Sequence, residues 1–225
     1  MGEFEEKYGD LYKGYYDPKA LEAKNARINM VIGSRSIGKT LSYRIYLVER
    51  YLKYGEKFVY VRRYNKQSQK MKNFWDKVKS KFPDHKFTQK GDTLMIDGET
   101  VGLKTGLTQF ASMKSEAYEG FERIVYDEFL PEATERYLDK EPLILAGLMR
   151  SVFRNNNNAK VIMLANNLSS ESPYYEYYKI RPVSGQRYNS KTITNENNGS
   201  KFKLLVDFVS DADLGKDIVK DAEGY

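Results

Sequence analysis

Residues 28–40 read INMVIGSRSIGKT, and this stretch limits the possible folds more than any other part of the 225-residue chain. An apolar, β-branched run reaches Gly33, and Gly-Lys-Thr follows at residues 38–40, which is the spacing G-x-x-x-x-G-K-[ST]. The two glycines lack a Cβ, so a triphosphate can approach the backbone closely. Successive backbone N–H groups and the positive end of the following helix then face the phosphate. The pattern predicts a phosphate-binding loop of the Walker A type between a strand and a helix.

The segment after the loop, TLSYRIYLVERYLKYG, supports this interpretation. Its apolar residues recur at steps of three and four from Leu41 to Leu52, and Gly55 ends the expected helix. Lys39 is expected to reach the β- and γ-phosphates, and the Thr40 hydroxyl to ligate Mg²⁺. The expected nucleotide-binding residues of the loop are Gly33, Ser34, Arg35, Ser36, Ile37, Gly38, Lys39 and Thr40.

Composition excludes several classes of protein. Hydrophobic residues make up 40% and charged residues 30%, which indicates a globular chain. No apolar run approaches the roughly 20 residues that span a bilayer, and the acidic N-terminus does not resemble a secretory signal. With no cysteine and one histidine (His85), the chain has no disulfide, thiolate or histidine-cluster site, and it fits a reducing interior. The net charge of +6 favours a polyanionic partner.

The remaining pattern predicts strands that alternate with helices. Residues 1–27 are expected to form an irregular N-terminal arm with a turn at Asp17-Pro18, and residues 211–225 a polar tail. Between them, at 28–210, the expected elements are strands at 58–62, 123–127, 161–165 and 201–209, helices at 65–81 and 141–154, a hairpin within 93–106 that turns at Asp97-Gly98, and a polar stretch at 189–200. This order predicts an α/β fold with a mostly parallel central sheet, flanked by helices and carrying an inserted β-hairpin.

A second motif ends the strand ERIVYDEF, where Asp127 and Glu128 follow an apolar run. In phosphate-loop proteins, a carboxylate at the tip of such a strand holds Mg²⁺ (the Walker B position), and Asp127 fits this role. Glu128 could orient and deprotonate a water as a general base, which favours hydrolysis over transfer to a second substrate. Taken alone, the pair could equally be strand-end acids at the solvent boundary. Together with the loop, it predicts a nucleoside triphosphatase.

Two further polar groups could take part. Asn166 ends the strand KVIMLANN, where it could hold the attacking water or sense the γ-phosphate, although a simple strand-end turn residue is equally compatible. Arg150 and Arg154 lie four apart on one face of the expected helix. Phosphoryl transfer gains from an arginine finger, which usually comes from a neighbouring subunit, so this interpretation implies a ring. An ordinary solvated or ion-paired arginine is the alternative for either residue.

The densest positive segment is a candidate for contact with DNA. Sequence-independent grip on DNA requires cations spaced along the phosphate backbone. This segment contains Lys66, Lys70, Lys72, Lys77, Lys79 and Lys81, partly offset by Asp76. A solvated basic helix explains the same pattern. The loops with Lys90, Lys104 and Lys114 are rival candidates.

Other nucleotide-binding classes are compatible with parts of the pattern. A phosphate-loop kinase is disfavoured by Glu128 and by the lack of an obvious arginine-rich lid. A GTPase is disfavoured because no N-K-x-D base-reading segment occurs. A nucleotide-switched binding module, which holds ATP and scarcely hydrolyses it, remains an alternative from another class.

Over residues 28 to about 180, the chain resembles the DNA packaging motor ATPases of small tailed bacteriophages with protein-primed genomes. The matching stretches, in order, are VIGSRSIGKT, YGEKFVYVRRYN, KFPDHKF, MKSEAYEG, IVYDEF, LMRSVFRN and VIMLANN. That family belongs to the additional-strand, catalytic-glutamate phosphate-loop ATPases, as do the FtsK and HerA translocases. The resemblance implies an N-terminal ATPase domain of this type at residues 28–210.

The resemblance also implies roles for individual residues. Residues 33–40 would hold the nucleotide phosphates and Mg²⁺, and Asp127 and Glu128 would hold the metal and activate water. Arg154, in SVFRN, is raised above Arg150 as the finger that acts in trans. Lys114, in MKSEAYEG, matches a lysine suggested to act across the subunit boundary. Arg62 matches a further arginine near the nucleotide, and Asn166 takes the sensor position.

Members of that family form a ring, pentameric in the well-known cases, at the portal vertex of the empty capsid. There they use ATP to drive double-stranded DNA inward, with a structural RNA in some members. The resemblance therefore implies ATP and Mg²⁺ as ligands, DNA and the portal (connector) protein as partners, and the cytoplasm of the infected bacterium as location. Relatives usually continue into a nuclease-like domain, so residues 211–225 are expected to be a tail or the start of a linker to a domain that this chain lacks.

Overall fold

Strand β1 (Ile28–Gly33) is buried along its whole length and lies inside a mixed β-sheet. It runs parallel to β7 on one side and to β9 on the other. Apolar residues on both faces of the strand explain this position, because a parallel strand is covered on both sides. The computed structural model describes residues 3–71, 73–110, 120–132, 134–154, 156, 158–167, 169–183, 185–194 and 199–210.

Within these described residues, nine strands form one sheet in the order β3-β4-β5-β2-β6-β7-β1-β9-β8. Besides β1, the strands are β2 (Lys57–Arg62), β3 (Phe87–Lys90), β4 (Thr93–Ile96), β5 (Glu99–Gly106), β6 (Phe121–Asp127), β7 (Lys160–Asn166), β8 (Tyr188–Thr194) and β9 (Lys201–Val209). The pairs from β5 through β9 are parallel, whereas the pairs at the two ends of the sheet are antiparallel. This confirms the expected mixed α/β class, with a mostly parallel sheet.

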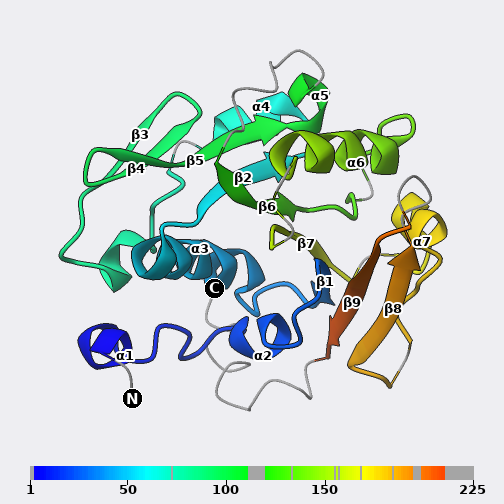
Figure 1. Ribbon diagram of the computed structural model, residues 1–225, viewed down its shortest axis with the longest axis horizontal. Coiled ribbons are helices and arrows are strands. Elements are labelled where there is room, and N and C mark those ends of the chain that lie inside the picture. The colour runs from blue at the N-terminus through cyan, green and yellow to red at the C-terminus, as the bar shows by residue number, and fades with distance from the viewer. Residues whose placement is uncertain are drawn as a thin grey trace.

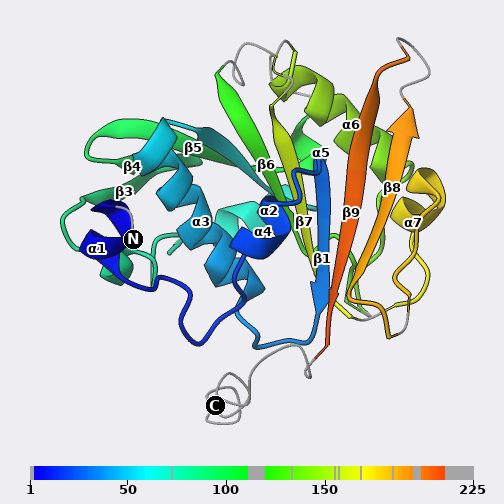
Figure 2. The same ribbon diagram turned by 60° about the horizontal axis from the view of Figure 1, so that its bottom comes forward.

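Helices cover both faces of the sheet (Figures 1 and 2). The described helices are α1 (Glu3–Tyr8), α2 (Lys19–Glu22), α3 (Lys39–Tyr54), α4 (Asn65–Lys70), α5 (Leu107–Phe110), α6 (Glu141–Val152), α7 (Pro173–Tyr178) and the 3-10 turn η1 (Lys79–Lys81). Helix α3 packs on one face together with residues of the N-terminal segment, and α6 and α7 pack on the other. No helix among the described residues is long and apolar enough to cross a membrane.

The helix expected at 65–81 is wrong in its length. Helix α4 ends at Lys70, turns follow, and Lys77 has a φ of 62°. The neighbouring Phe74 and Trp75 are both buried, with ring centroids 4.9 Å apart. Adjacent side chains of one regular helix point about 100° apart, so burying both aromatic rings in the same core favours turns over a continuous helix.

Three further expectations are corrected at the edges of the fold. The N-terminal segment is not simply irregular, because it contains α1 and α2 and buries Tyr12 and Tyr16 in the core. The expected hairpin at Asp97-Gly98 is present, but β3 extends it to three antiparallel strands. Residues 189–194 of the expected polar stretch belong to the edge strand β8, whose mixed polar pattern fits a strand with solvent access.

Candidate nucleotide and magnesium site

The phosphate loop joins β1 to α3 and depends on its two glycines. A Cβ on Gly33 would lie 2.8 Å from the Val209 carbonyl oxygen, and Gly38 has a φ of 77° where it caps α3. Ser36 also has a positive φ, of 72°. These left-handed positions let the backbone between β1 and α3 fold into a tight turn that presents N–H groups at the start of the helix. The loop therefore has the geometry that its spacing predicts.

Lys39 lies at the first position of α3, and its side chain folds back over the loop. Its ammonium donates hydrogen bonds to the carbonyls of Gly33 (3.0 Å) and Ser34 (2.6 Å) and lies 3.4 Å from the Asn166 amide oxygen. Burial lowers the pKa of Lys39 to about 8, although Asp127 acts in the opposite direction. The lysine is thus a buried cation whose charge a phosphate would stabilise.

Two oxygen ligands meet beside this lysine. The Thr40 hydroxyl donates a hydrogen bond of 3.1 Å to Oδ1 of Asp127, which ends β6. Mg²⁺ commonly uses one or two protein oxygens together with water and phosphate oxygens, so this pair fits the metal. Asp127 is 2% exposed, and its other oxygen accepts a 2.6 Å hydrogen bond from the Tyr60 hydroxyl. These contacts orient the carboxylate toward the loop.

Arg62, at the end of β2, binds both acids of the second motif. Its guanidinium lies 2.8 Å from Oδ2 of Asp127 and forms an ion pair with Glu128. Burial acts to lower the pKa of Arg62, but the charges of Asp127, Tyr60 and Glu128 outweigh it and raise that pKa. The structure therefore brings together Lys39, Thr40, Arg62, Asp127, Glu128 and Asn166 at the carboxyl ends of neighbouring strands.

The backbone at Glu128 is unusual. This residue has a φ of 62°, although it is not glycine. The next residue holds it in place, because the Phe129 N–H donates to Leu164 O (3.1 Å) and the Phe129 carbonyl accepts from Arg63 (2.7 Å). Positive φ at a non-glycine residue persists only where its surroundings enforce it. Here a buried arginine and β7 hold the chain so that the Glu128 side chain meets Arg62.

Several residues of this site escaped the sequence analysis. Tyr60 and Arg62 are two residues apart on β2, so their side chains point to the same face of the strand. This spacing could have indicated that Tyr60 also contacts Asp127. Arg63 is 1% exposed and pairs with Glu141 at 2.8 Å, a contact that joins β2 to the start of α6. Nothing in the sequence marks that pair, because its partners lie 78 positions apart. Arg35 of the loop forms an exposed ion pair with Glu132.

The arginines considered as fingers lie away from this site in their own chain. Arg154 follows the end of α6 and is exposed, as is Arg150. The adjacent Phe153 packs under Arg27, which precedes β1, and so lies near the amino ends of the strands. One chain therefore does not bring Arg154 to its own Asp127. Lys114 lies outside the described residues.

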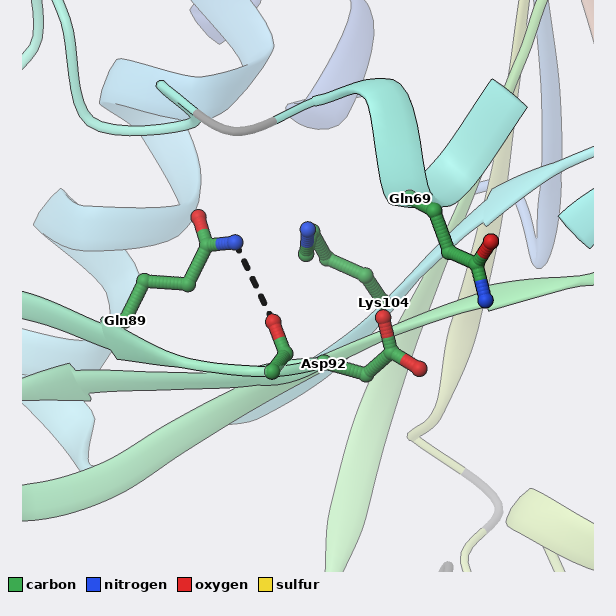
Figure 3. A pocket seen from close by; sticks show the side chains of 5 residues that line it. Gln69, Gln89, Asp92 and Lys104 are labelled. Carbon is green, nitrogen blue, oxygen red and sulfur yellow. Dashed lines mark hydrogen bonds between the residues drawn. The ribbon is translucent and has the colours of Figure 1, made fainter. Parts of the chain in front are cut away.

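The lysines considered for DNA differ in exposure. Lys66, Lys70, Lys77 and Lys79 are exposed, whereas Lys72 lies outside the described residues. Lys104 is 2% exposed, and its ammonium donates to the carbonyls of Ser68 (3.3 Å) and Met71 (3.1 Å). It lines a polar hollow with Gln69, Gln89, Gly91 and Asp92, apart from the phosphate loop (Figure 3). Lys104 thus holds the end of α4 and is poorly placed to grip a partner.

Comparison with known proteins relates the chain to one family of phage proteins. The family model described as podovirus DNA encapsidation protein (Gp16) matches residues 12–211. The DNA packaging protein of Bacillus phage phi29 is 34% identical over 205 residues, covering 86% of this chain and 62% of its own length. That of Bacillus phage B103 is 34% identical over 211 residues, covering 83% of this chain and 66% of its own. The chain thus spans about two thirds of these curated relatives.

Solved structures give the same result. The crystal structure of the N-terminal domain of the phi29 DNA packaging ATPase matches with a TM-score of 0.77 at 34% identity, over 87% of this chain and 96% of that one. The ATPase domain of the Thermus phage P74-26 large terminase, at 13% identity and a TM-score of 0.55 over 93% of this chain and 84% of that one, shares only the fold. Because the family model covers most of its residues, the chain belongs to the podovirus DNA encapsidation protein (Gp16) family.

Proposed function

We propose that this chain is an ATP-hydrolysing motor subunit that moves double-stranded DNA into a preformed capsid. The observation that carries the proposal is the convergence of Lys39, Thr40, Asp127 and Glu128 at one edge of the sheet. Its relatives are named DNA packaging proteins, and a similar solved structure is the N-terminal domain of a packaging ATPase. The ligands implied are ATP and Mg²⁺.

The order of the strands supports the additional-strand, catalytic-glutamate class. Strand β7 lies between β1, which leads to the phosphate loop, and β6, which ends in the acid pair. Asn166 at the tip of β7 therefore lies between the two motifs, 3.4 Å from Lys39. This is the position from which an amide could sense a γ-phosphate or hold water.

In the proposed reaction, the loop N–H groups and Lys39 would bind the phosphates, and Thr40 with Asp127 would hold Mg²⁺. The metal supplies neutralisation of phosphate charge when it is bound. Glu128 accepts the proton of the attacking water. Arg62 orients both carboxylates, since one terminal nitrogen of its guanidinium contacts Asp127 and the other contacts Glu128. The products are ADP and inorganic phosphate.

We further propose that the complete site includes a neighbouring subunit. Arg154 lies exposed beyond α6 and away from its own acid pair, so in this proposal it would act on a neighbour's nucleotide. Lys114 would act across the same boundary. The assembly would be a ring, a pentamer at the portal vertex of the procapsid in the host cytoplasm, with a structural RNA as a further partner. Lys66, Lys70, Lys72, Lys77 and Lys79 would contact DNA.

The test is steady-state ATP hydrolysis over a series of protein concentrations, with and without linear double-stranded DNA. Arg154→Ala and the matched surface variant Arg150→Ala are each mixed with wild type. We expect turnover per chain to rise with concentration and with DNA, and only Arg154→Ala to poison the mixtures. Turnover that is independent of concentration, DNA and Arg154→Ala would contradict the ring motor. ATP binding without turnover would favour the nucleotide-switched module.

A further inference from the structure

The N-terminal segment passes directly against the phosphate loop. The Tyr16 N–H donates a 2.9 Å hydrogen bond to the Ile37 carbonyl, one residue before Gly38. In Figure 2, the segment between α1 and α2 runs beside the N-terminus of α3. Residues 9–18 therefore form one wall of the region around the loop.

Two tyrosines anchor this wall. The Tyr12 hydroxyl donates to Glu49 of α3 at 2.6 Å, and the Tyr16 hydroxyl donates to Asp207 of β9 at 2.7 Å. They are 3% and 1% exposed, and burial raises the pKa of both. A buried tyrosine normally finds such a hydroxyl partner. Tyr12 and Tyr16 are thus explained as structural residues that fix the backbone between them.

Tyr15 differs from both. It is only half-buried, and its hydroxyl makes no hydrogen bond with any residue that the structure describes. Its side chain covers Gly38: a Cβ built there would lie 2.5 Å from Cδ1, 3.0 Å from Cβ and 3.1 Å from Cγ of Tyr15. The ring is also accessible to a charged group, since the Lys81 ammonium lies 5.8 Å from its centroid. Neither core packing nor a hydroxyl bond accounts for this ring.

We propose that Tyr15 is the base-stacking residue of the nucleotide site and stacks on the base of a nucleoside triphosphate. This inference rests on the proposed nucleotide binding. Gly38 lies next to Lys39 and Thr40, which would bind the phosphates. The sugar and base of a bound nucleotide would therefore lie beside the residues that surround this loop, and Tyr15 is one of them. An aromatic ring fixed against Gly38 offers the base a π surface, and stacking tolerates any base because each has a π face. Phosphate binding, in contrast, uses only the loop and Lys39.

The experiment compares equilibrium binding of Mg²⁺-ATP and Mg²⁺-tripolyphosphate, which carries the phosphates without a base. The variants are Tyr15→Ala, Tyr15→Phe and Lys39→Ala, with Tyr54→Ala as a matched control at an exposed tyrosine of α3. Tyr15→Ala is expected to weaken ATP binding about 10-fold or more and tripolyphosphate binding less than about two-fold. Tyr15→Phe and Tyr54→Ala should keep both affinities, because stacking needs a ring and no hydroxyl. Lys39→Ala should weaken both ligands.

Other outcomes overturn the inference. Unchanged ATP affinity in Tyr15→Ala would exclude stacking, and an equal loss for both ligands would show that Tyr15 supports the loop alone. If wild type binds neither ligand, the proposed nucleotide binding itself fails. A second measurement uses Tyr15→Trp: the indole emission added by this substitution should change with ATP and not with tripolyphosphate. A response to both ligands would contradict base stacking.

Discussion

Two arginines on neighbouring parallel strands each bind two acids, one at the carboxyl ends of the strands and the other at their amino ends. Arg62 ends β2 and pairs with Asp127 and Glu128, while Arg123 near the start of β6 pairs with Glu22 and Glu56. The two clusters contain the same chemical groups. They differ in exposure, in backbone conformation and in how many other groups bind the acids.

The cluster at Arg123 is closed. Glu22 also binds Lys160 and Asn29, and Glu56 also binds Arg50. Burial would raise the pKa of Glu56, but hydrogen bonds from Arg50 and Arg123 hold it at about 2. Each acid is thus satisfied by several donors from different elements, and the network ties α2, β1, β6 and β7 together. Such a cluster stabilises the fold and presents no reactive group.

The cluster at Arg62 is open. The Glu128 side chain is 39% exposed, its backbone has a φ of 62°, and Arg62 is the ion-pair partner found for it among the described residues. It also adjoins the phosphate loop through Asp127 and Thr40. Charged pairs occur in both clusters, so under the proposed function the reactivity would come from what only the Arg62 cluster has, an exposed acid with a positive φ beside the phosphate loop.

The largest expected effect is at Glu128. Glu128→Gln should lower kcat for ATP about 10²- to 10⁴-fold, because it removes the proposed general base. It should change the free energy of unfolding by less than about 1 kcal/mol, since the pair is partly exposed. The matched control, Glu56→Gln, should lower stability and leave kcat unchanged below the unfolding temperature. Steady-state rates and thermal melts measure both; equal loss of kcat in the two variants would remove the distinction.

At the closed cluster, the expected effect is on stability. Arg123→Met should lower the free energy of unfolding by up to about 3–5 kcal/mol, because two largely buried acids each lose one of their two cations. Denaturant titration measures this free energy of unfolding, and Arg62→Met is the corresponding variant in the open cluster. We expect Arg62→Met to reduce kcat more and stability less than Arg123→Met does. The reverse order would mean that Arg62 is the structural residue.

The next effect concerns pH and Lys39. With its pKa lowered to about 8, Lys39 is protonated below that pH and loses its proton above it. Binding of phosphate then requires uptake of a proton, so nucleotide affinity should fall by up to about 10-fold per pH unit above pH 8. Binding isotherms between pH 7 and 10 measure the slope. Lys39→Arg keeps its charge and should lose this dependence; a slope that persists in it would assign the proton to another group.

The smallest expected effect is on DNA binding. Helix α4 begins at Asn65, three residues after Arg62, so Lys66 and Lys70 lie on the helix that follows the open cluster. Lys66→Gln and Lys70→Gln should each weaken DNA binding modestly and reduce the slope of log K against log salt by about 1. Lys203→Gln, an exposed lysine near the start of β9, is the matched control. No change in slope for either variant would exclude these phosphate contacts.

The local motifs of this fold could be predicted because each depends on neighbouring residues. The loop at 33–40 and the strand that ends at Asp127 follow from glycine conformation, apolar runs and terminal polar groups. The segment at 65–81 could not be predicted correctly. Its basic composition and weak apolar stripe suit a helix, yet burial of Phe74 and Trp75 against the sheet decides its course.

The same division holds within the site. The sequence by itself determined a phosphate loop, an acid pair and the α/β class, since spacing and periodicity specify them. Only the tertiary structure decided that Tyr60 and Arg62 hold the acids, that Arg63 and Glu141 fix the backbone after Glu128, and that Tyr15 lies on Gly38. These contacts join residues far apart in the chain, and their partners are set by how strands and helices pack.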